Sequence, residues 1–133
     1  MFNERTKINL KDVRPELVEL WTAVNKIYKI TCIEGKRSAA RQAELLRTGK
    51  SKRLDGKHTT EPLSEATDVV PTDFNWNKPN SFNEIRKCYF LAGIVKAVAL
   101  DLGFTIRYGG DWDGDNDFSD QTFNDLVHYE IIL

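Results

Sequence analysis

The chain contains two histidines, His58 in a polar segment that is predicted to be a loop and His128 in the last predicted strand, and both are candidate metal ligands. Neutral imidazole offers a nitrogen lone pair near neutral pH, which makes histidine the commonest transition-metal ligand. Asp68 is the natural third ligand, because a carboxylate inside the short apolar run EATDVV needs a metal or another partner. Two histidines and one carboxylate leave a fourth position open for water, as in catalytic zinc sites. On residue types alone, the alternative is that both histidines are ordinary surface or core residues.

A second candidate metal site lies in the acidic segment DWDGDNDFSD, residues 111–120. Four carboxylates alternate along it: Asp111, Asp113, Asp115 and Asp117. This spacing resembles the start of an EF-hand loop, which supplies oxygen ligands to calcium. The sixth position is Asn116 rather than Gly, and the twelfth is Thr122 rather than Glu. Because closely spaced carboxylates repel one another, either a calcium ion or solvent must relieve their charge.

Three helices are predicted to position these residues. The first begins at Pro15, a residue suited to a first helical turn, and carries apolar residues at helical spacing. The second begins at Ser38 and ends near Gly49. Ser81 and Glu84 form a capping box for the third helix, which Gly103 closes. The apolar faces of these helices are expected to form the core.

Four short apolar segments are predicted to be strands: residues 30–34, 65–70, 104–108 and 127–131. Side chains alternate between the two faces of a strand, which places Glu34 on the face of Cys32. In the last strand, His128 and Glu130 share the face opposite Tyr129. The pattern indicates an α+β fold with one domain over residues 1–133, in which helices pack on a small, largely antiparallel sheet.

Composition argues against a membrane-inserted or nucleic-acid-binding protein. No apolar run approaches the roughly 20 residues of a membrane span, and MFNERTKINL has no secretory h-region, so we expect folding in the cytoplasm. The net charge is −1, and basic residues of the first half lack interleaved aromatics, which argues against nucleic acid. That basic half is either a solvated surface or a face for an anionic polymer. Cys32 and Cys88 are expected to be buried free thiols in a monomeric protein.

Segments spread along the chain resemble the zinc-dependent D-alanyl-D-alanine and L-alanyl-D-glutamate peptidases, a group with VanX-like and VanY-like enzymes and many phage endolysins. That family has a His, a short insert, an Ala-x-Asp, and later a carboxylate-x-x-His-x-Glu. KHTTEPLSEATDVVP and DLVHYEI carry these as His58, Ala66–Asp68, and Asp125, His128 and Glu130. EGKRSAARQAELL, VRPELVEL and IRYGGDWDGD also resemble family segments, and all run in the family's order.

The chain departs from the family pattern beside His58. Nine residues separate His58 from Asp68, about three more than is usual, which an insertion near Pro62 would explain. Gly56 stands where the family commonly has Ser. We expect these departures to alter the shape of the cleft beside His58 rather than the choice of ligands.

The resemblance implies a hedgehog/DD-peptidase-like fold and a role for each matched residue. Zinc would be held by His58, Asp68 and His128. Asp125 would be the general base, and Glu130 would orient a ligand imidazole or compete as the base. Arg37, the family's arginine, would hold a substrate carboxylate or carbonyl beside the scissile bond, next to Gln42. Three aromatic residues are candidates for a substrate groove or for the core: Trp76, Tyr108 and Trp112.

The function implied by the resemblance is hydrolysis of the L-Ala–D-Glu bond in peptidoglycan stem peptides by a phage endolysin. Such an enzyme would act on the cell wall after a separate pore-forming protein releases it from the host cytoplasm. Two alternatives remain open. One is a D-Ala-D-Ala carboxypeptidase or dipeptidase of the same family, which Asp125 disfavours because VanX-like enzymes use Glu there. The other is a non-catalytic, zinc-stabilised binding module of a phage tail.

Overall fold

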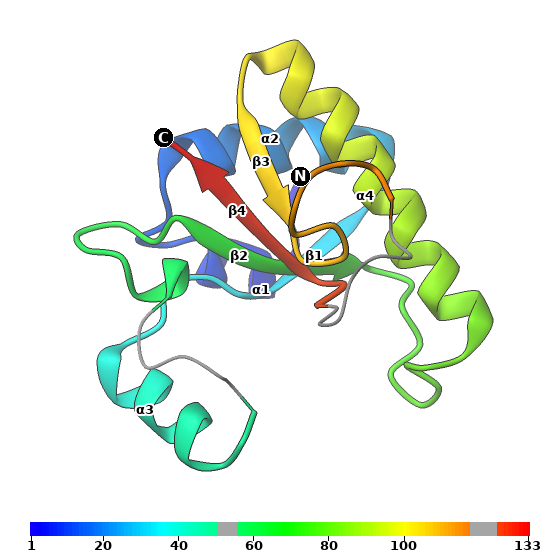
Figure 1. Cartoon of the computed structure of the whole chain (residues 1–133). Coiled ribbons are helices and arrows are strands. Elements are labelled where there is room, and N and C mark those ends of the chain that lie inside the picture. The colour runs from blue at the N-terminus through cyan, green and yellow to red at the C-terminus, as the bar shows by residue number, and fades with distance from the viewer. Residues whose placement is uncertain (51–55, 118–124) are drawn as a thin grey trace.

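An antiparallel sheet with the strand order β1-β2-β4-β3 lies at the centre of the protein (Figure 1). The computed structural model describes residues 1–50, 56–117 and 125–133. Within them the strands are β1 Ile30–Glu34, β2 Ala66–Pro71, β3 Thr105–Tyr108 and β4 His128–Ile132. The helices are α1 Glu4–Asn9, α2 Pro15–Ile27, α3 Ala39–Arg47, η1 Lys57–Thr59 (a 3₁₀ turn) and α4 Phe82–Leu102. The predicted α+β class is therefore confirmed.

The helix boundaries follow from capping residues that the sequence identifies. Pro15 is the first residue of α2. The side chain of Ser38 caps α3, and the Ser81 hydroxyl accepts a hydrogen bond from the backbone N–H of Glu84 at the start of α4. Gly103 ends α4 with a φ of 81°, a left-handed conformation that glycine adopts without a Cβ penalty. The three predicted helices are thus confirmed.

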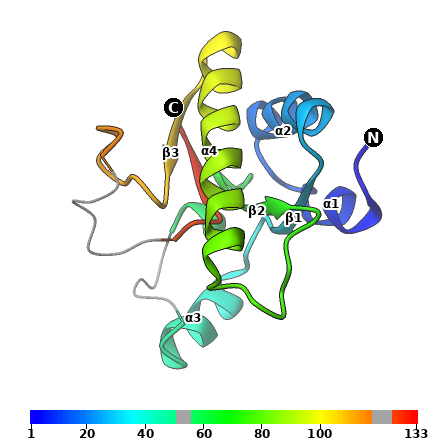
Figure 2. The same ribbon diagram turned by 90° about the vertical axis from the view of Figure 1, so that its right-hand side faces the viewer.

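The core lies where α2 and α4 cover one face of the sheet, as Figure 2 shows. Trp21 of α2 is fully buried and donates its indole N–H to the Thr67 hydroxyl over 2.9 Å. Its ring meets that of Tyr129 edge to face, with centroids 5.0 Å apart. A buried aromatic pair of this kind adds about 0.5–1.5 kcal/mol to the hydrophobic burial. This packing fixes which face of β4 is turned away from the core.

The other face of the sheet carries polar side chains, among them Asp68 and His128, and α3 lies apart from α2 and α4 (Figures 1 and 2). His128 and Glu130 point to this side of β4, whereas Tyr129 and Ile131 belong to the core. The alternation predicted for the last strand is therefore confirmed, and it gathers polar side chains on one surface.

A bulge in β1 changes the orientation expected for Glu34. Cys32 pairs with Val69, but Glu34 pairs with Asp68, so the register shifts between them. Since Val69 and Asp68 point to opposite faces of β2, Glu34 lies opposite Cys32, and the expectation of a shared face was wrong. An extra residue in one strand reverses the alternation beyond it, and such bulges are frequent beside active sites.

The short helix α1 was not anticipated by the sequence analysis. Its six residues are too few to show a helical period, although the Asn3 side chain caps it by accepting from the N–H of Thr6. Asn9 donates from its side chain to the carbonyl of Cys32 over 2.9 Å. The backbone of Asn9 also lies against Gly35, where an added Cβ would sit 1.9 Å from the Asn9 oxygen. Helix α1 thus fixes the turn that follows β1.

Two further expectations can be compared with the structure. Cys32 and Cys88 are both buried and unpaired, as predicted. Among the described residues, none of the helices has the combination of length and apolar composition that crossing a bilayer requires.

Candidate active site

The three predicted metal ligands converge from three elements. His58 lies on η1, Asp68 on β2, and His128 is the first residue of β4, directly opposite Asp68 in the ladder. The His58 Nε2 atom is 3.1 Å from Asp68 Oδ1 and 3.2 Å from His128 Nδ1. The third side of the triangle, from His128 Nδ1 to Asp68 Oδ1, is 3.3 Å. Both imidazoles are buried, so these atoms meet in a largely dry environment.

In each imidazole, the partner of the ring nitrogen that lies away from Asp68 shows which nitrogen carries the proton. His58 Nδ1 lies 2.8 Å from the carbonyl oxygen of Gly35, which can only accept a hydrogen bond, so Nδ1 carries a proton. His128 Nε2 lies 2.9 Å from Glu130 Oε1, and a carboxylate likewise accepts. In neutral imidazole the other nitrogen is then the acceptor. In this neutral form, His58 Nε2 and His128 Nδ1 offer lone pairs on the side of Asp68, and a metal ion there would take the place of the proton that a charged imidazole donates to Asp68.

These three atoms form a group that can hold a metal ion, and their spacing fits zinc. Ligands of tetrahedral zinc, with bonds of about 2.0–2.1 Å, lie roughly 3.3 Å apart, close to the three observed distances. Burial would raise the pKa of Asp68, but hydrogen bonds from the two imidazoles hold it below its ordinary value. Burial would lower the pKa of His128, yet its contacts with Asp68 and Glu130 raise it to about 9. The raised pKa of His128 reflects the carboxylates beside it, whereas the lowered pKa of Asp68 reflects the imidazole donors that face it. A cation bound between these residues would stabilise the Asp68 carboxylate in the same way.

Glu130 holds the outer edge of the His128 ring. It is buried, and its Oε1 atom accepts from Nε2, on the far side of the ring from Asp68. A carboxylate in this position fixes the tautomer and the orientation of a metal-binding imidazole. This placement suits the orienting role suggested for Glu130 better than the role of a base.

We expect that Glu130→Ala lowers zinc affinity by about 10- to 100-fold, because His128 loses the partner that orients its ring. Glu130→Gln keeps the shape and an accepting oxygen but loses the charge, so its effect should be smaller. Competition with a chelator of known affinity measures both. Glu4→Ala, at an exposed position of α1, is the control. Unchanged zinc affinity in Glu130→Ala would contradict the orienting role.

Arg37 lies beside the ligands, but much of its donor set is already engaged. Its Nε and Nη2 atoms donate to the two carboxylate oxygens of Glu34 over 2.9 and 2.6 Å, and Nη1 donates to Gln42 over 2.7 Å. Nη2 also lies 3.7 Å from Asp68 Oδ2. The structure thus brings the predicted pair Arg37 and Gln42 together next to Asp68. Glu34 was missed by the sequence analysis because the bulge in β1 cannot be read from alternation.

Asp125, the predicted base, stands three residues before His128 and is held through its backbone. Its N–H donates to the carbonyl of Gly109 over 2.9 Å, and its carbonyl accepts from the N–H of His128 over 3.2 Å. A Cβ on residue 109 would lie 2.0 Å from the Asp125 oxygen, so only glycine permits this approach. Burial and the negative charge of Asp68 raise the pKa of Asp125, the direction expected for a proton acceptor that works near neutral pH.

The three aromatic candidates lie in different places. The Trp112 ring is 5.4 Å from the ring of His128, at the edge of the site. Tyr108 is buried in the core and donates its hydroxyl to the carbonyl of Leu126. Trp76 packs against Phe74 in the loop after β2 and is 55% exposed. Of the three, Trp112 is the one in contact with a candidate ligand.

The acidic segment forms a second group of carboxylates. Ligand atoms of Asp111, Asp113 and Asp115 lie within 4.8 Å of one another. Asp117 is outside this group, and its N–H donates to the Asp115 side chain over 2.8 Å. Residues 118–120 and Thr122, the twelfth EF-hand position, lie outside the described residues.

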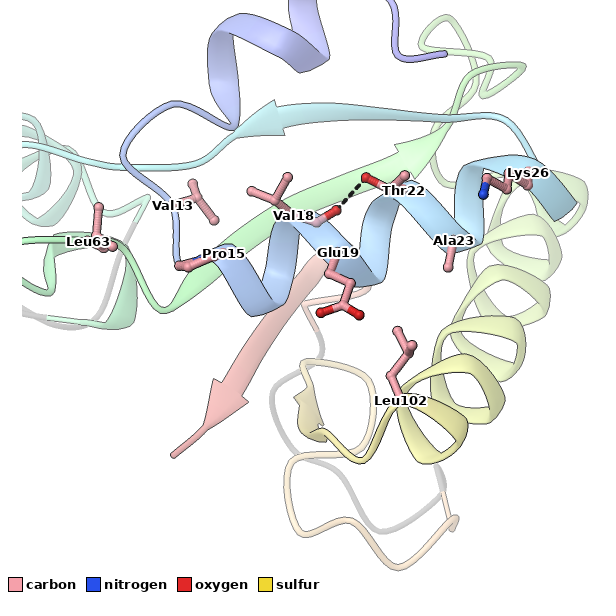
Figure 3. Close-up of a pocket in the computed structure, with 9 residues that line it drawn as sticks. All are labelled: Val13, Pro15, Val18, Glu19, Thr22, Ala23, Lys26, Leu63 and Leu102. Carbon is pink, nitrogen blue, oxygen red and sulfur yellow. Dashed lines mark hydrogen bonds between the residues drawn. The ribbon is translucent and has the colours of Figure 1, made fainter.

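An apolar groove runs along α2, away from these residues (Figure 3). Val18, Leu63 and Leu102 are among its lining side chains, and none of the three candidate metal ligands lines it. The groove therefore does not bear on the chemistry of the site.

Comparison with known proteins gives a consistent result. A family model described as phage L-alanyl-D-glutamate peptidase matches residues 1–132. The L-alanyl-D-glutamate peptidase of Escherichia phage T5 is 26% identical over 125 residues, which cover 90% of this chain and 87% of the T5 protein. The crystal structure of the Serratia marcescens L-Ala D-Glu endopeptidase ChiX superimposes with a TM-score of 0.73 and 27% identity, covering 98% of this chain and 89% of ChiX.

Proposed function

The chain belongs to the family of phage L-alanyl-D-glutamate peptidases, and we propose from this premise that it is a zinc-dependent endopeptidase of bacterial peptidoglycan. The bond cut is the one between L-Ala and D-Glu of the stem peptide. The observation that carries the proposal is the convergence of His58 Nε2, Asp68 Oδ1 and His128 Nδ1 at 3.1–3.3 Å. When bound there, zinc would supply a Lewis acid and a water with a pKa of about 7.

The protein's own residues complete the reaction. Asp125 takes a proton from the attacking water and passes it to the nitrogen of the leaving D-Glu. Support for this role comes from its raised pKa and from its electrostatic interaction with Asp68 and His128. Glu130 keeps the His128 ring in the tautomer that faces Asp68.

Arg37 is proposed to assist at the scissile carbonyl rather than at a substrate carboxylate. Its bidentate contact with Glu34 already neutralises much of its charge, and its side chain is only 10% exposed. The N–H groups of Arg37 that lie near Asp68 and are not used by Glu34 or Gln42 can donate to a single carbonyl oxygen. Gln42, which is buried and accepts from Nη1, keeps the guanidinium in this orientation.

The endopeptidase differs from its two alternatives in its products. Digestion of purified peptidoglycan should release peptides with new D-Glu amino termini, identified by mass spectrometry. Released D-Ala would instead indicate a D-Ala-D-Ala carboxypeptidase or dipeptidase. A zinc-loaded protein that binds peptidoglycan without cleaving it would indicate the non-catalytic module, and either of these outcomes would overturn the proposal.

In the cell we propose that the protein is a phage endolysin that works as a monomer. It would accumulate in the cytoplasm of the infected bacterium and reach the wall once a separate pore-forming protein opens the membrane. The phage T5 relative and the match to a phage family model support this assignment.

Asp111, Asp113 and Asp115 are proposed to hold calcium, a hard cation that prefers several carboxylate oxygens. Asp111 is 7% exposed, and its Oδ1 atom is buried without a hydrogen-bond partner among the described residues. A buried carboxylate oxygen that lacks a partner is costly unless a cation binds it.

We expect Asp111→Asn to lower calcium affinity about tenfold or more, since affinity depends on the number of charged ligands. Isothermal titration of the zinc-loaded protein with calcium measures this, with Asp101→Asn on α4 as a matched control. Wild-type protein that gives no calcium-binding heat, or equal binding by Asp111→Asn, would exclude the calcium site.

A further inference from the structure

We propose that Arg107 binds the free carboxylate of the D-Glu residue on the leaving side of the scissile bond, and so selects substrates in which that group is charged. This inference rests on the proposed function and adds a specificity residue to it. Arg107 lies on β3 directly opposite Glu130 of β4. Cross-strand partners project from the same face of a sheet. The Arg107 side chain therefore emerges on the face that carries His128 and Asp68.

Contacts with Trp112 hold the Arg107 guanidinium beside the site. The Cζ atom lies 4.9 Å from the centroid of the Trp112 ring, and Nε donates to the Trp112 carbonyl over 3.1 Å. The same ring also lies against His128, with the two ring centroids 5.4 Å apart. Arg107, Trp112 and His128 thus form a continuous row of contacts that leads from the guanidinium to a candidate metal ligand.

The terminal nitrogens of Arg107 remain available for a substrate. Nη1 forms a long ion pair with Glu130 Oε2 at 3.8 Å, which is too far for a hydrogen bond, and within the described part of the chain the terminal nitrogens of Arg107 donate no hydrogen bond. The side chain is 44% exposed, against 10% for Arg37. Arg37 is paired with Glu34 through both carboxylate oxygens. Of these two arginines, Arg107 is the one whose terminal nitrogens can still donate to a carboxylate in a bidentate contact.

The proposed substrate carries the matching group in the right place. A glutamate residue has two carboxyl groups, and the stem peptide continues through one of them, so the other is free. With the scissile carbonyl near Asp68 and His128, the D-Glu residue extends about 3.5 Å beyond the bond that is cut. Its free carboxylate then faces the rim of the site, where Arg107 supplies a positive charge in a partly desolvated setting.

The test is a comparison of two peptides, identical except that the free carboxyl group of D-Glu is a carboxylate in one and a carboxamide in the other. For wild-type zinc-loaded protein we expect kcat/KM to favour the carboxylate peptide by about 10- to 100-fold, the range of a charge-assisted bidentate contact. In Arg107→Gln the ratio should fall to near one. The loss should be confined to the carboxylate peptide, with cleavage of the carboxamide peptide almost unchanged.

Two controls separate this role from a structural one. Arg86 lies over the ring of Phe82 on α4, also in a cation–π contact but away from the polar face, so Arg86→Gln should keep the wild-type ratio. Zinc content verifies that Arg107→Gln retains the metal. The inference is overturned if Arg107→Gln keeps the preference for the carboxylate peptide, or if its kcat/KM falls equally for both peptides. It is also overturned if Arg37→Gln abolishes the preference instead. Wild-type protein that cleaves neither peptide at L-Ala–D-Glu would refute the proposed function itself.

Discussion

Asp125→Asn is expected to lower turnover by about 10²- to 10⁴-fold while the protein keeps its zinc, which is the range for loss of a general acid–base group. The amide has nearly the shape of the carboxylate but cannot accept a proton from water at neutral pH. The backbone contacts with Gly109 and His128 do not depend on the side chain, so the fold around the site should be preserved.

The measurement for Asp125 is the steady-state rate on an L-Ala–D-Glu peptide together with zinc content of the same sample. Asp125→Ala should behave alike, because the missing function is proton transfer. Asp101→Asn, the same change near the end of α4, should retain the wild-type rate. A metal-bearing Asp125→Asn or Asp125→Ala protein with full activity would eliminate Asp125 as the base.

Removing a metal ligand should have a larger effect on zinc binding than any other substitution. His128→Ala and Asp68→Ala each delete one corner of a triangle whose sides are 3.1–3.3 Å. Zinc affinity should fall by more than the roughly 100-fold upper limit for an outer partner such as Glu130, and cleavage should fall to background. Adding zinc back should restore little of the cleavage activity.

Thermal unfolding with and without zinc provides a second readout for the ligands. A metal that binds only the folded state raises the melting temperature, so wild-type protein should be stabilised by zinc and both variants should not. Asp73→Ala, in the loop after β2, is the control and should respond to zinc as wild type does. Zinc bound with wild-type affinity by either ligand variant would mean that the metal site lies elsewhere.

The features that could be predicted from sequence are those with local causes. Ser38 and Ser81 mark the starts of helices because their side chains accept hydrogen bonds from backbone N–H groups of the first turn. Gly103 marks the end of α4 because it has no Cβ to oppose the left-handed backbone conformation there. Alternation along β4 sends His128 toward the polar face whenever Tyr129 is in the core. The resemblance to zinc peptidases supplied the rest of the candidate site, since residue types alone left the histidines ambiguous.

The features that could not be predicted depend on pairing between distant segments. Glu34 reaches Arg37 and Asp68 only because of the bulge in β1, which is set by the ladder with β2. Arg107 lies beside the site because β3 pairs with β4 in a register that places it opposite Glu130. Hydrophobic periodicity within one segment carries no information about register between two segments.

The most direct test of the whole account is cleavage of a defined L-Ala–D-Glu peptide by one preparation of the wild-type protein, measured as zinc is removed by a chelator and then restored. We predict one zinc per chain at full activity, a rate that falls in proportion to the zinc removed, and recovery when zinc is returned. Zinc-free protein that cleaves this bond at the original rate would contradict a metal-dependent reaction at His58, Asp68 and His128.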